Sequence, residues 1–503
     1  MNLVFLKRLK SLRILPLLLF SVIGFLVMGY HPGAEDNGVY LPAIKADLNG
    51  SLFPHDAAFF QLQMRTSVFP NLMAHFIRMT GMQLEWAELL GQLISIVMLL
   101  WACWSIVSQL FKEVEARWAG LAMVAAMFTL PVAGTGLYIV DQYLHPRAMA
   151  TALILFGVSR ILVGKGWQSV PLLVLSTVLH PLMGAMGISF SCFLALMLFE
   201  PFQAYLRTFR ERPVSDAAAM VAIFIPLGSV FHTPSQIWLE IARSRHLLRL
   251  YQWEWYEWLG VLGPLMLFWL VAFVAHKREE TKLASLAMAV FIFGIFQLAV
   301  AMIIHGFPSL IGLTALEPMR FLHLVYVFMT LLGGAYLGRY VLRRRAWRWV
   351  VFLILANVGM FFAQRQLFAG TEHLELPGRS SANPWLLAFT WIRQNTPADA
   401  YFALNPEYLA APGEDYQGFR ALAERSQLAD DIKDRSVVTL GPELGEVWAR
   451  QVKAQEGWAH FQLGDFERLK VQFGVNWVLV SYPPPEGLAC RWHNEALTVC
   501  QVP

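Results

Sequence analysis

Long apolar runs separated by short polar segments fill the chain as far as residue 363. A helix of about 17 to 25 residues crosses a hydrocarbon core of roughly 30 Å, because each residue adds about 1.5 Å. Measured against this length, the pattern predicts eleven membrane-spanning helices. Their expected bounds are residues 14–29, 89–110, 119–140, 148–163, 169–184, 186–198, 217–231, 259–275, 283–303, 321–337 and 350–362.

The fifth and sixth predicted spans meet at residues 179–187. Pro181, Gly184 and Gly187 interrupt an apolar run that is too long for one span, since proline removes a backbone donor and glycine weakens a helix. We therefore expect a tight helical hairpin at this point.

The pattern changes beyond Gln364. Pro, Gly, Asp and Glu punctuate short apolar runs there, of which residues 471–481 indicate a strand and residues 385–394 a short helix. We therefore divide the chain into a membrane domain, residues 1–363, and a small α/β domain, residues 364–503. The predicted fold class is an α-helical polytopic membrane protein with a small external α/β domain at its C-terminus.

The first long polar segment, residues 31–88, exceeds what a connection between two spans requires. Its residues 56–80 are apolar enough for the membrane interface, but Arg65, Pro70 and Arg78 make them a poor span. We expect one or two helices lying on the membrane surface. Their start is predicted near Asp56, because aspartate is a typical N-cap residue.

Composition agrees with a membrane protein. Of 503 residues, 57% are hydrophobic and 15% charged, where soluble proteins carry about 25% charged residues. With a mean hydropathy of +0.49, this excludes a disordered chain and an ordinary cytosolic enzyme. A net charge of +4 is too small to indicate a nucleic-acid partner, and the sequence contains no P-loop, dinucleotide-binding glycine motif or HExxH motif.

The lysines and arginines predict the orientation. Before residue 364, most of them fall in the N-terminal flank and in the alternate loops on its side. The positive-inside rule places these loops in the cytoplasm, so we expect an uncleaved first helix with a cytoplasmic N-terminus. An odd number of spans then places residues 364–503 outside, where Cys490 and Cys500 could form a disulfide in an oxidising compartment.

Two adjacent acids, Glu35 and Asp36, follow the first predicted span within a few residues. A carboxylate at the membrane interface suits general-base chemistry, because partial burial raises its pKa and a nearby arginine favours the ionised form. The alternative is that both acids cap the next helix or are simply solvated. His55 and Asp56, further along the same loop, are substrate-contact candidates whose structural alternative is a helix start.

The second external loop places Asp141, Tyr143, His145 and Arg147 just before the fourth span. Cations at a helix start form a suitable seat for a phosphate, because the helix dipole is positive there. The structural alternative is an Arg147–Asp141 ion pair with Tyr143 as an interfacial anchor. His180 repeats the His-Pro pair at the next external turn and should face the same side.

Later external loops add further candidates. Arg243 and Arg245 precede the run YQWEWYEW, which is typical of an aromatic belt at the membrane surface. Its aromatic faces also suit stacking on sugar rings, with Glu254 and Glu257 within reach of hydroxyl groups. Arg320 precedes the tenth span, where an arginine either snorkels to the surface or binds a lipid-linked phosphate.

This layout resembles the GT-C superfamily of integral-membrane glycosyltransferases, in particular uncharacterised bacterial members. The acidic pair in a long first external loop, the number of spans and the external C-terminal domain all agree. The stretches that resemble these members are HPRAMA at 145–150 and LHPLMG at 179–184 in the membrane domain, with WIRQNTPADA at 391–400, GFRALAERSQLADD at 418–431 and FGVNWVLV at 473–480 in the tail.

The resemblance implies transfer of a hexose or pentose from a polyprenyl-phosphate-sugar to a glycan, lipid or protein hydroxyl, outside a bacterial inner membrane. Asp36 or Glu35 would be the base, while His145, Arg147 and Arg320 would bind the donor phosphate. Some superfamily members use a divalent cation such as Mg²⁺ or Mn²⁺, which Asp36 and Asp56 would hold here. The chain reads Glu-Asp-Asn-Gly where several branches have Asp-Glu or Asp-x-Asp, so the acting acid and the metal requirement stay open.

Other functions fit the same membrane layout. A transporter or flippase would normally carry charges inside its spans, and the predicted spans hold almost none. A polysaccharide polymerase or ligase would share the lipid-linked donor. A non-catalytic accessory subunit of an envelope polysaccharide system is a further alternative, since the scaffold can lose its activity.

Overall fold

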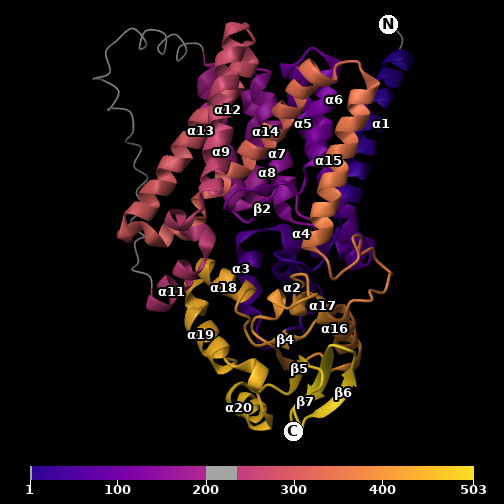
Figure 1. Ribbon diagram of the computed structural model, residues 1–503, viewed down its shortest axis with the longest axis vertical. Helices are drawn as coiled ribbons and strands as arrows, with labels where there is room; N and C mark the ends of the chain where they lie inside the picture. Colours follow the sequence, from indigo (N-terminus) through magenta and orange to yellow (C-terminus); the bar gives the residue numbers. More distant parts are fainter. Residues whose placement is uncertain (1–2, 200–234) are drawn as a thin grey trace.

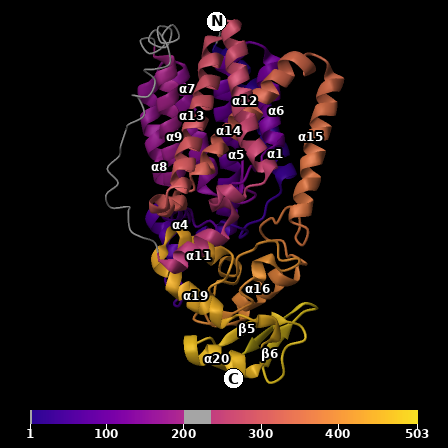
Figure 2. The same ribbon diagram turned by 60° about the vertical axis from the view of Figure 1, so that its left-hand side comes forward.

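The computed structural model describes residues 3–199 and 235–503 (Figure 1). Long helices form one end of the molecule, and the C-terminal strands and short helices form the other (Figures 1 and 2). The two chain termini lie at opposite ends. The predicted span at residues 217–231 falls outside the described residues.

Apolar helices make up the larger part. Six described segments are long and apolar enough to cross a membrane, namely Leu84–Leu110, Pro181–Leu198, Trp255–Lys277, Thr281–Gly306, Ser309–Leu342 and Ala346–Leu367. The chain is therefore a helical membrane protein, and the total of eleven spans stays a prediction. The helices of this part are α1 (Leu3–Met28), α5 (Leu84–Leu110), α6 (Val114–Ala126), α7 (Pro146–Leu162), α8 (Ser169–Leu179), α9 (Pro181–Leu198), α12 (Trp255–Lys277), α13 (Thr281–Gly306), α14 (Leu322–Leu337) and α15 (Ala346–Leu367).

The third predicted span, at residues 119–140, is wrong in its second half. Helix α6 ends at Ala126, and the chain continues into a short hairpin of β1 (Pro131–Val132) and β2 (Leu137–Tyr138). Pro131 lacks the backbone donor that a helix needs, and Gly134 and Gly136 adopt φ values of +64° and +65° in the turn. An apolar run alone did not reveal this break.

The helical hairpin predicted at residues 179–187 is present. Helix α8 ends at Leu179 and α9 begins at Pro181, so His180 is the turning residue. A Cβ atom on Gly184 would lie 2.3 Å from Cα of Thr177, so the close approach of the two helices requires glycine.

Three helices form in the first long polar segment, residues 31–88: α2 (Asn37–Leu48), α3 (Ala58–Thr66) and α4 (Phe69–Thr80). The predicted pair in residues 56–80 corresponds to α3 and α4. The expectation that both lie on a membrane is wrong for α3, because Phe59 packs with Ile241 of α11 (Gln236–Ser244) and with Val438 of the C-terminal part. Helix α4 keeps Leu72 and Met79 exposed.

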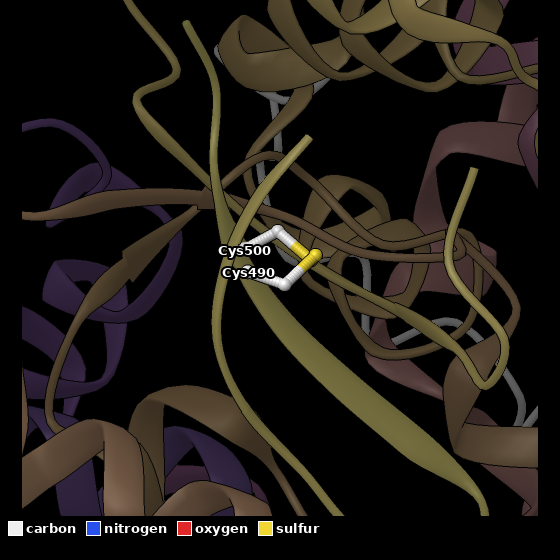
Figure 3. Close-up of a disulfide and its surroundings, with 2 residues drawn as sticks. All are labelled: Cys490 and Cys500. Atoms are coloured by element: carbon white, nitrogen blue, oxygen red, sulfur yellow. A yellow bond between two sulfur atoms is a disulfide. The ribbon is translucent and has the colours of Figure 1, made fainter. Parts of the chain in front are cut away.

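The C-terminal part contains a five-stranded sheet with strand order β4-β3-β5-β7-β6. Strand β3 (Tyr401–Ala403) is parallel to β4 (Ser426–Gln427) and β5 (Trp477–Ser481), whereas β7 (Leu497–Gln501) is antiparallel to β5 and to β6 (Ala489–His493). A disulfide joins Cys490 on β6 to Cys500 on β7 (Figure 3). The helices around the sheet are α16 (Pro384–Asn395), α17 (Phe419–Ala423), α18 (Lys433–Leu440), α19 (Gly445–Ala454) and α20 (Leu463–Phe473).

Two sequence predictions concern this part. The short helix at residues 385–394 corresponds to α16. The strand at residues 471–481 is correct only from Trp477, because residues as far as Phe473 belong to α20. Gly474, with a φ of +83°, ends that helix in the left-handed conformation typical of a C-terminal glycine.

The segment that begins at Tyr30 docks on the C-terminal part. Ala34 forms a β-bridge with Gln417, and Tyr30 forms one with Leu374. The buried ammonium group of Lys45 donates to the carbonyl oxygen of Ala421 at 2.7 Å. These contacts fix the position of the acidic pair relative to both parts of the molecule.

Candidate functional site

Glu35 and Asp36 lie in the turn between α1 and α2. Glu35 has a φ of 45°, a left-handed conformation that costs on the order of 1 kcal/mol for a residue other than glycine. Its backbone N–H donates to the carbonyl oxygen of Tyr416 at 2.8 Å. The C-terminal part therefore helps to hold the acidic pair in place.

His145 lies at the start of α7, beside the acidic pair. It is the N-cap residue, and its Nδ1 accepts a hydrogen bond from the backbone N–H of Arg147 at 3.1 Å. Because Nδ1 is an acceptor, the neutral ring carries its proton on Nε2, which lies 3.7 Å from Oδ2 of Asp36. Burial and the positive charge of Arg147 hold the pKa of His145 well below its usual value, so the ring is neutral at neutral pH.

Arg147 is the buried cation of the site, with a side chain 2% exposed. Its Nε donates to Oδ2 of Asp141 at 3.2 Å, and its Nη2 donates to Oδ2 of Asp36 at 3.3 Å. The Arg147–Asp141 ion pair considered as the structural alternative is thus present, and Asp36 shares the same guanidinium. Among the described residues, nothing accepts a hydrogen bond from Nη1 of Arg147.

A second cation reaches Asp36 from the C-terminal part. The ammonium group of Lys433, the first residue of α18, lies 2.6 Å from Oδ1 of Asp36. The carboxylate of Asp36 remains 37% exposed. Burial opposes ionisation of Asp36, but the charges of Lys433 and Arg147 outweigh it and hold its pKa well below the usual range.

The environment of Glu35 raises its pKa, in contrast to that of Asp36. Burial raises the pKa of Glu35 to about 7, against the attraction of Lys433 and with added repulsion from Asp36. The hydroxyl of Tyr143 donates to Oε2 of Glu35 at 3.3 Å and accepts from the backbone N–H of Asp36 at 3.3 Å. Tyr143 is fully buried, so it orders the acidic pair instead of anchoring the chain at a membrane surface.

Arg245 and Arg320 form a neighbouring cationic group around Glu317. Arg320 pairs with Glu317 through Nε, and Nη1 of Arg245 lies 3.7 Å from the same carboxylate. Arg245 also donates to the hydroxyl of Thr439 at 2.8 Å. Burial, with added contributions from the charges of Arg147 and Arg320, lowers the pKa of His180 to about 3.

His180 repeats the geometry of His145 at the start of α9. Its Nδ1 accepts from the backbone N–H of Met183 at 3.3 Å. The ring centroids of His180 and His145 lie 5.7 Å apart. The two His-Pro pairs therefore lie close together.

Other predicted site residues lie away from this cluster. Arg243 is exposed on α11, and His55 stacks on Tyr401 with ring centroids 4.5 Å apart. Asp56 is buried, pairs with Arg420 and accepts from the backbone N–H of Gln427 at 3.0 Å. These contacts hold the loop on the C-terminal part.

The aromatic run has a mixed role. Glu254 and Glu257 form the capping box of α12, and Glu257 lies 3.0 Å from the ring of His246. Trp255 and Tyr256 are exposed by 74% and 58%, as residues of an aromatic belt would be. The two glutamates are therefore occupied by the helix start.

A divalent cation does not fit the described residues. The carboxylates of Asp36 and Asp56 are bound to cations from different segments and do not meet. In residues 3–199 and 235–503, no group of three His, Cys, Asp or Glu side chains is placed to hold a metal ion. The positive charges of Lys433 and Arg147 beside Asp36 would also repel one.

Sequence reasoning missed Lys433. The residue lies in the stretch LADDIKDRS, where mixed charges resemble an ordinary solvated helix start. It is 397 positions away from its partner Asp36. The available signal was indirect, since the predicted topology places the first loop and the C-terminal part on the same side of the membrane.

No family model matches the chain, and no curated protein matches it. Among solved structures, the oligosaccharyltransferase of Archaeoglobus fulgidus in its apo form is similar over 93% of this chain and 69% of its own, with 10% sequence identity and a TM-score of 0.41. The same protein tethered to an acceptor peptide is similar over 94% and 69%, with 11% identity and a TM-score of 0.43. Its complex with an inhibitory peptide and a dolichol-phosphate covers the same shares, with 11% identity and a TM-score of 0.41. The likeness is distant.

Proposed function

We propose that the chain is a membrane glycosyltransferase that moves a sugar from a polyprenyl-phosphate donor to an acceptor hydroxyl. The observation that supports this most directly is the contact of Asp36 with both Arg147 and Lys433. A carboxylate that is 37% exposed, beside one buried cation and one partly exposed cation, offers a base and a phosphate-binding position in one place. The resemblance of the sequence to the GT-C superfamily points to the same reaction.

In the proposed reaction, the acceptor oxygen attacks C1 of the sugar while the bond from C1 to the phosphate oxygen breaks. Asp36 takes the proton of the acceptor hydroxyl. The departing polyprenyl phosphate keeps the electron pair of the broken bond, and Arg147 and Arg320 stabilise the charge that grows on it. A phosphate is a good leaving group, so the step requires cations instead of a general acid.

Glu35 is the alternative base. Its pKa of about 7 is closer to neutrality than that of Asp36, which favours proton uptake near neutral pH. Asp36, however, contacts both cations that would face the donor phosphate, Arg147 and Lys433, whereas Glu35 accepts a hydrogen bond from Tyr143. We therefore assign proton removal to Asp36 and the ordering of the turn to Glu35 and Tyr143.

The proposal includes a location and a division of the chain. We place residues 1–363 in a bacterial inner membrane with a cytoplasmic N-terminus, and residues 364–503 on the periplasmic side. The site then lies at the outer surface, where a lipid-linked donor is delivered through the membrane and a glycan, lipid or protein acceptor is accessible. The sugar is a hexose or a pentose.

The test compares Asp36→Asn with Glu35→Gln, and Asp47→Asn is the matched control. Asp47 lies in the same loop but pairs with Arg78 on an exposed surface. Lipid-linked and surface glycans are measured by mass spectrometry in cells producing equal amounts of each variant. We expect Asp36→Asn to reduce sugar transfer by at least about 100-fold, as loss of a general base does, and Asp47→Asn to leave it unchanged.

Two outcomes would contradict the proposal. Full transfer by Asp36→Asn together with loss in Glu35→Gln would move the base to Glu35. Uptake of a lipid-linked sugar into proteoliposomes without any glycosidic product would identify a flippase and reject sugar transfer.

A further inference from the structure

We propose that Lys433 binds the donor phosphate, its ammonium group moving from Asp36 to the phosphate when the donor enters. The inference rests on the proposed function and makes the C-terminal part a component of the site. Helix α18, which begins at Lys433, lies where the C-terminal part meets α3 of the first loop (Figure 1).

Lys433 is the movable cation beside Asp36. Its ammonium group contacts Oδ1 of Asp36 at 2.6 Å, and its side chain is 21% exposed. Arg147, by contrast, is 2% exposed and is held by Asp141 as well as by Asp36. A single contact on a flexible four-carbon stem breaks more readily than a buried guanidinium held by two carboxylates.

The backbone of Lys433 is fixed, so the exchange requires rotation of its side chain alone. Its backbone N–H donates to Oδ1 of Asp430, which also accepts from the backbone N–H of Asp434 at 3.1 Å. The carboxylate of Asp434 in turn receives two hydrogen bonds from Arg420, at 2.8 and 2.9 Å. The start of α18 is therefore anchored while the ammonium group is able to move.

The charges of the site leave room for one further anion. Arg147 and Lys433 face two carboxylates, those of Asp36 and Asp141, so this group is balanced while Glu35 beside it keeps its proton, which its pKa of about 7 favours below neutral pH. The neighbouring group has an excess of one positive charge, because one carboxylate is shared by two arginines (Glu317 with Arg245 and Arg320). A phosphate diester carries a single negative charge. Nη1 of Arg147 has no acceptor among the described residues, so a phosphate bound there would lie near Lys433, which shares Asp36 with Arg147.

The exchange would link donor binding to the action of the base. With Lys433 on Oδ1 and Arg147 on Oδ2, both oxygens of Asp36 face a cation. Movement of Lys433 to the phosphate exposes Oδ1 to the acceptor hydroxyl. Asp36 would therefore become an effective base only after the donor has bound, which limits proton removal in its absence.

A double-mutant cycle of Lys433→Met and Asp36→Asn tests the exchange. The full chain is placed in phosphatidylcholine nanodiscs, and its affinity for a polyprenyl monophosphate is measured, with inorganic phosphate as a second probe. We expect Lys433→Met to weaken polyprenyl-phosphate binding about 10-fold, which corresponds to about 1.4 kcal/mol. Asp36→Asn removes the carboxylate that competes with the phosphate for the ammonium group of Lys433. The gain in affinity from Asp36→Asn should therefore be at least about threefold larger when Lys433 is present than in the Lys433→Met background.

Two variants serve as controls. Lys433→Arg keeps the charge and should restore affinity to within about threefold, which separates loss of charge from misfolding. Arg435→Met removes a neighbouring cation of α18 that is held by Asp431, and should change affinity less than twofold. If Lys433→Met weakens the binding of inorganic phosphate more than that of the polyprenyl phosphate, the site is assigned to free phosphate.

The outcomes distinguish the inference from the function. The role of Lys433 would be overturned if Asp36→Asn raised the affinity for polyprenyl phosphate equally in the wild-type and Lys433→Met chains, or if Lys433→Met alone bound with normal affinity. Either result would leave the proposed function standing. A wild-type chain that binds no polyprenyl phosphate would reject both.

Discussion

Asp36 and Asp56 belong to the same long loop, residues 31–88, and each meets a cation from the C-terminal part, yet their surroundings differ. Asp36 is 37% exposed and contacts Lys433, whereas Asp56 is 1% exposed and contacts Arg420. Arg420 also binds Asp434 through its two terminal guanidinium nitrogens, Nη1 and Nη2. The buried network fixes the loop on the C-terminal part, while the half-exposed carboxylate remains within reach of a ligand. Burial decides which carboxylate is structural and which is available for chemistry.

The largest expected effect comes from breaking the buried network. Arg420→Met would leave Asp56 and Asp434 buried without their cation, and removal of one partner from such a network costs about 3 to 5 kcal/mol. The free energy of unfolding is measured by chemical denaturation of the purified protein in detergent. Arg243→Met, an arginine removed from an exposed position on α11, is the control and should cost less than about 0.5 kcal/mol. Equal stabilities of the two variants would show that the network does not hold the loop.

The next largest effect is a pH dependence of the free energy of unfolding that comes from Glu35 and distinguishes it from its neighbour Asp36. The pKa of Glu35 is raised from 4.5 to about 7, so the folded chain binds this proton more tightly than the unfolded chain. The wild type should therefore lose about 1 to 3 kcal/mol of stability from Glu35 as the pH rises from 4.5 to 7. Glu35→Gln should lack this part of the decline. The measurement is denaturation of both proteins at several pH values, and parallel curves would contradict the raised pKa.

The sequence could predict the half of the site that local patterns encode. The cluster of Asp141, Tyr143, His145 and Arg147 was visible because a helix start gathers nearby side chains at one point. Lys433 was not visible, since its contact with Asp36 depends on how two distant segments pack. The same limit applies to Asp56. Its position in the long loop predicts a role in ligand binding, whereas its partner in the structure is Arg420 of α17.

Fold prediction failed where one proline and two glycines outweighed a long apolar pattern. The run at residues 119–140 is apolar throughout, but Pro131 and two glycines turn it into a hairpin. At residues 179–187 the same kind of signal was read correctly, because Pro181 divides a run that is too long for one span. Hydropathy thus locates apolar segments, and backbone chemistry decides whether each of them is one helix.

The smallest expected effect is on the stability of Asp36→Asn, and it completes the contrast with Asp56. Arg147 keeps its ion pair with Asp141 at 3.2 Å after the substitution, and Lys433 is exposed enough to be solvated. The contact that is lost is therefore of the partly exposed kind, which contributes about 0 to 1 kcal/mol. Denaturation of Asp36→Asn beside Asp56→Asn checks this directly, with the second variant expected to lose several times more. A loss of similar size in both would mean that Asp36 is a structural residue, and its exposure to the solvent would then have no chemical purpose.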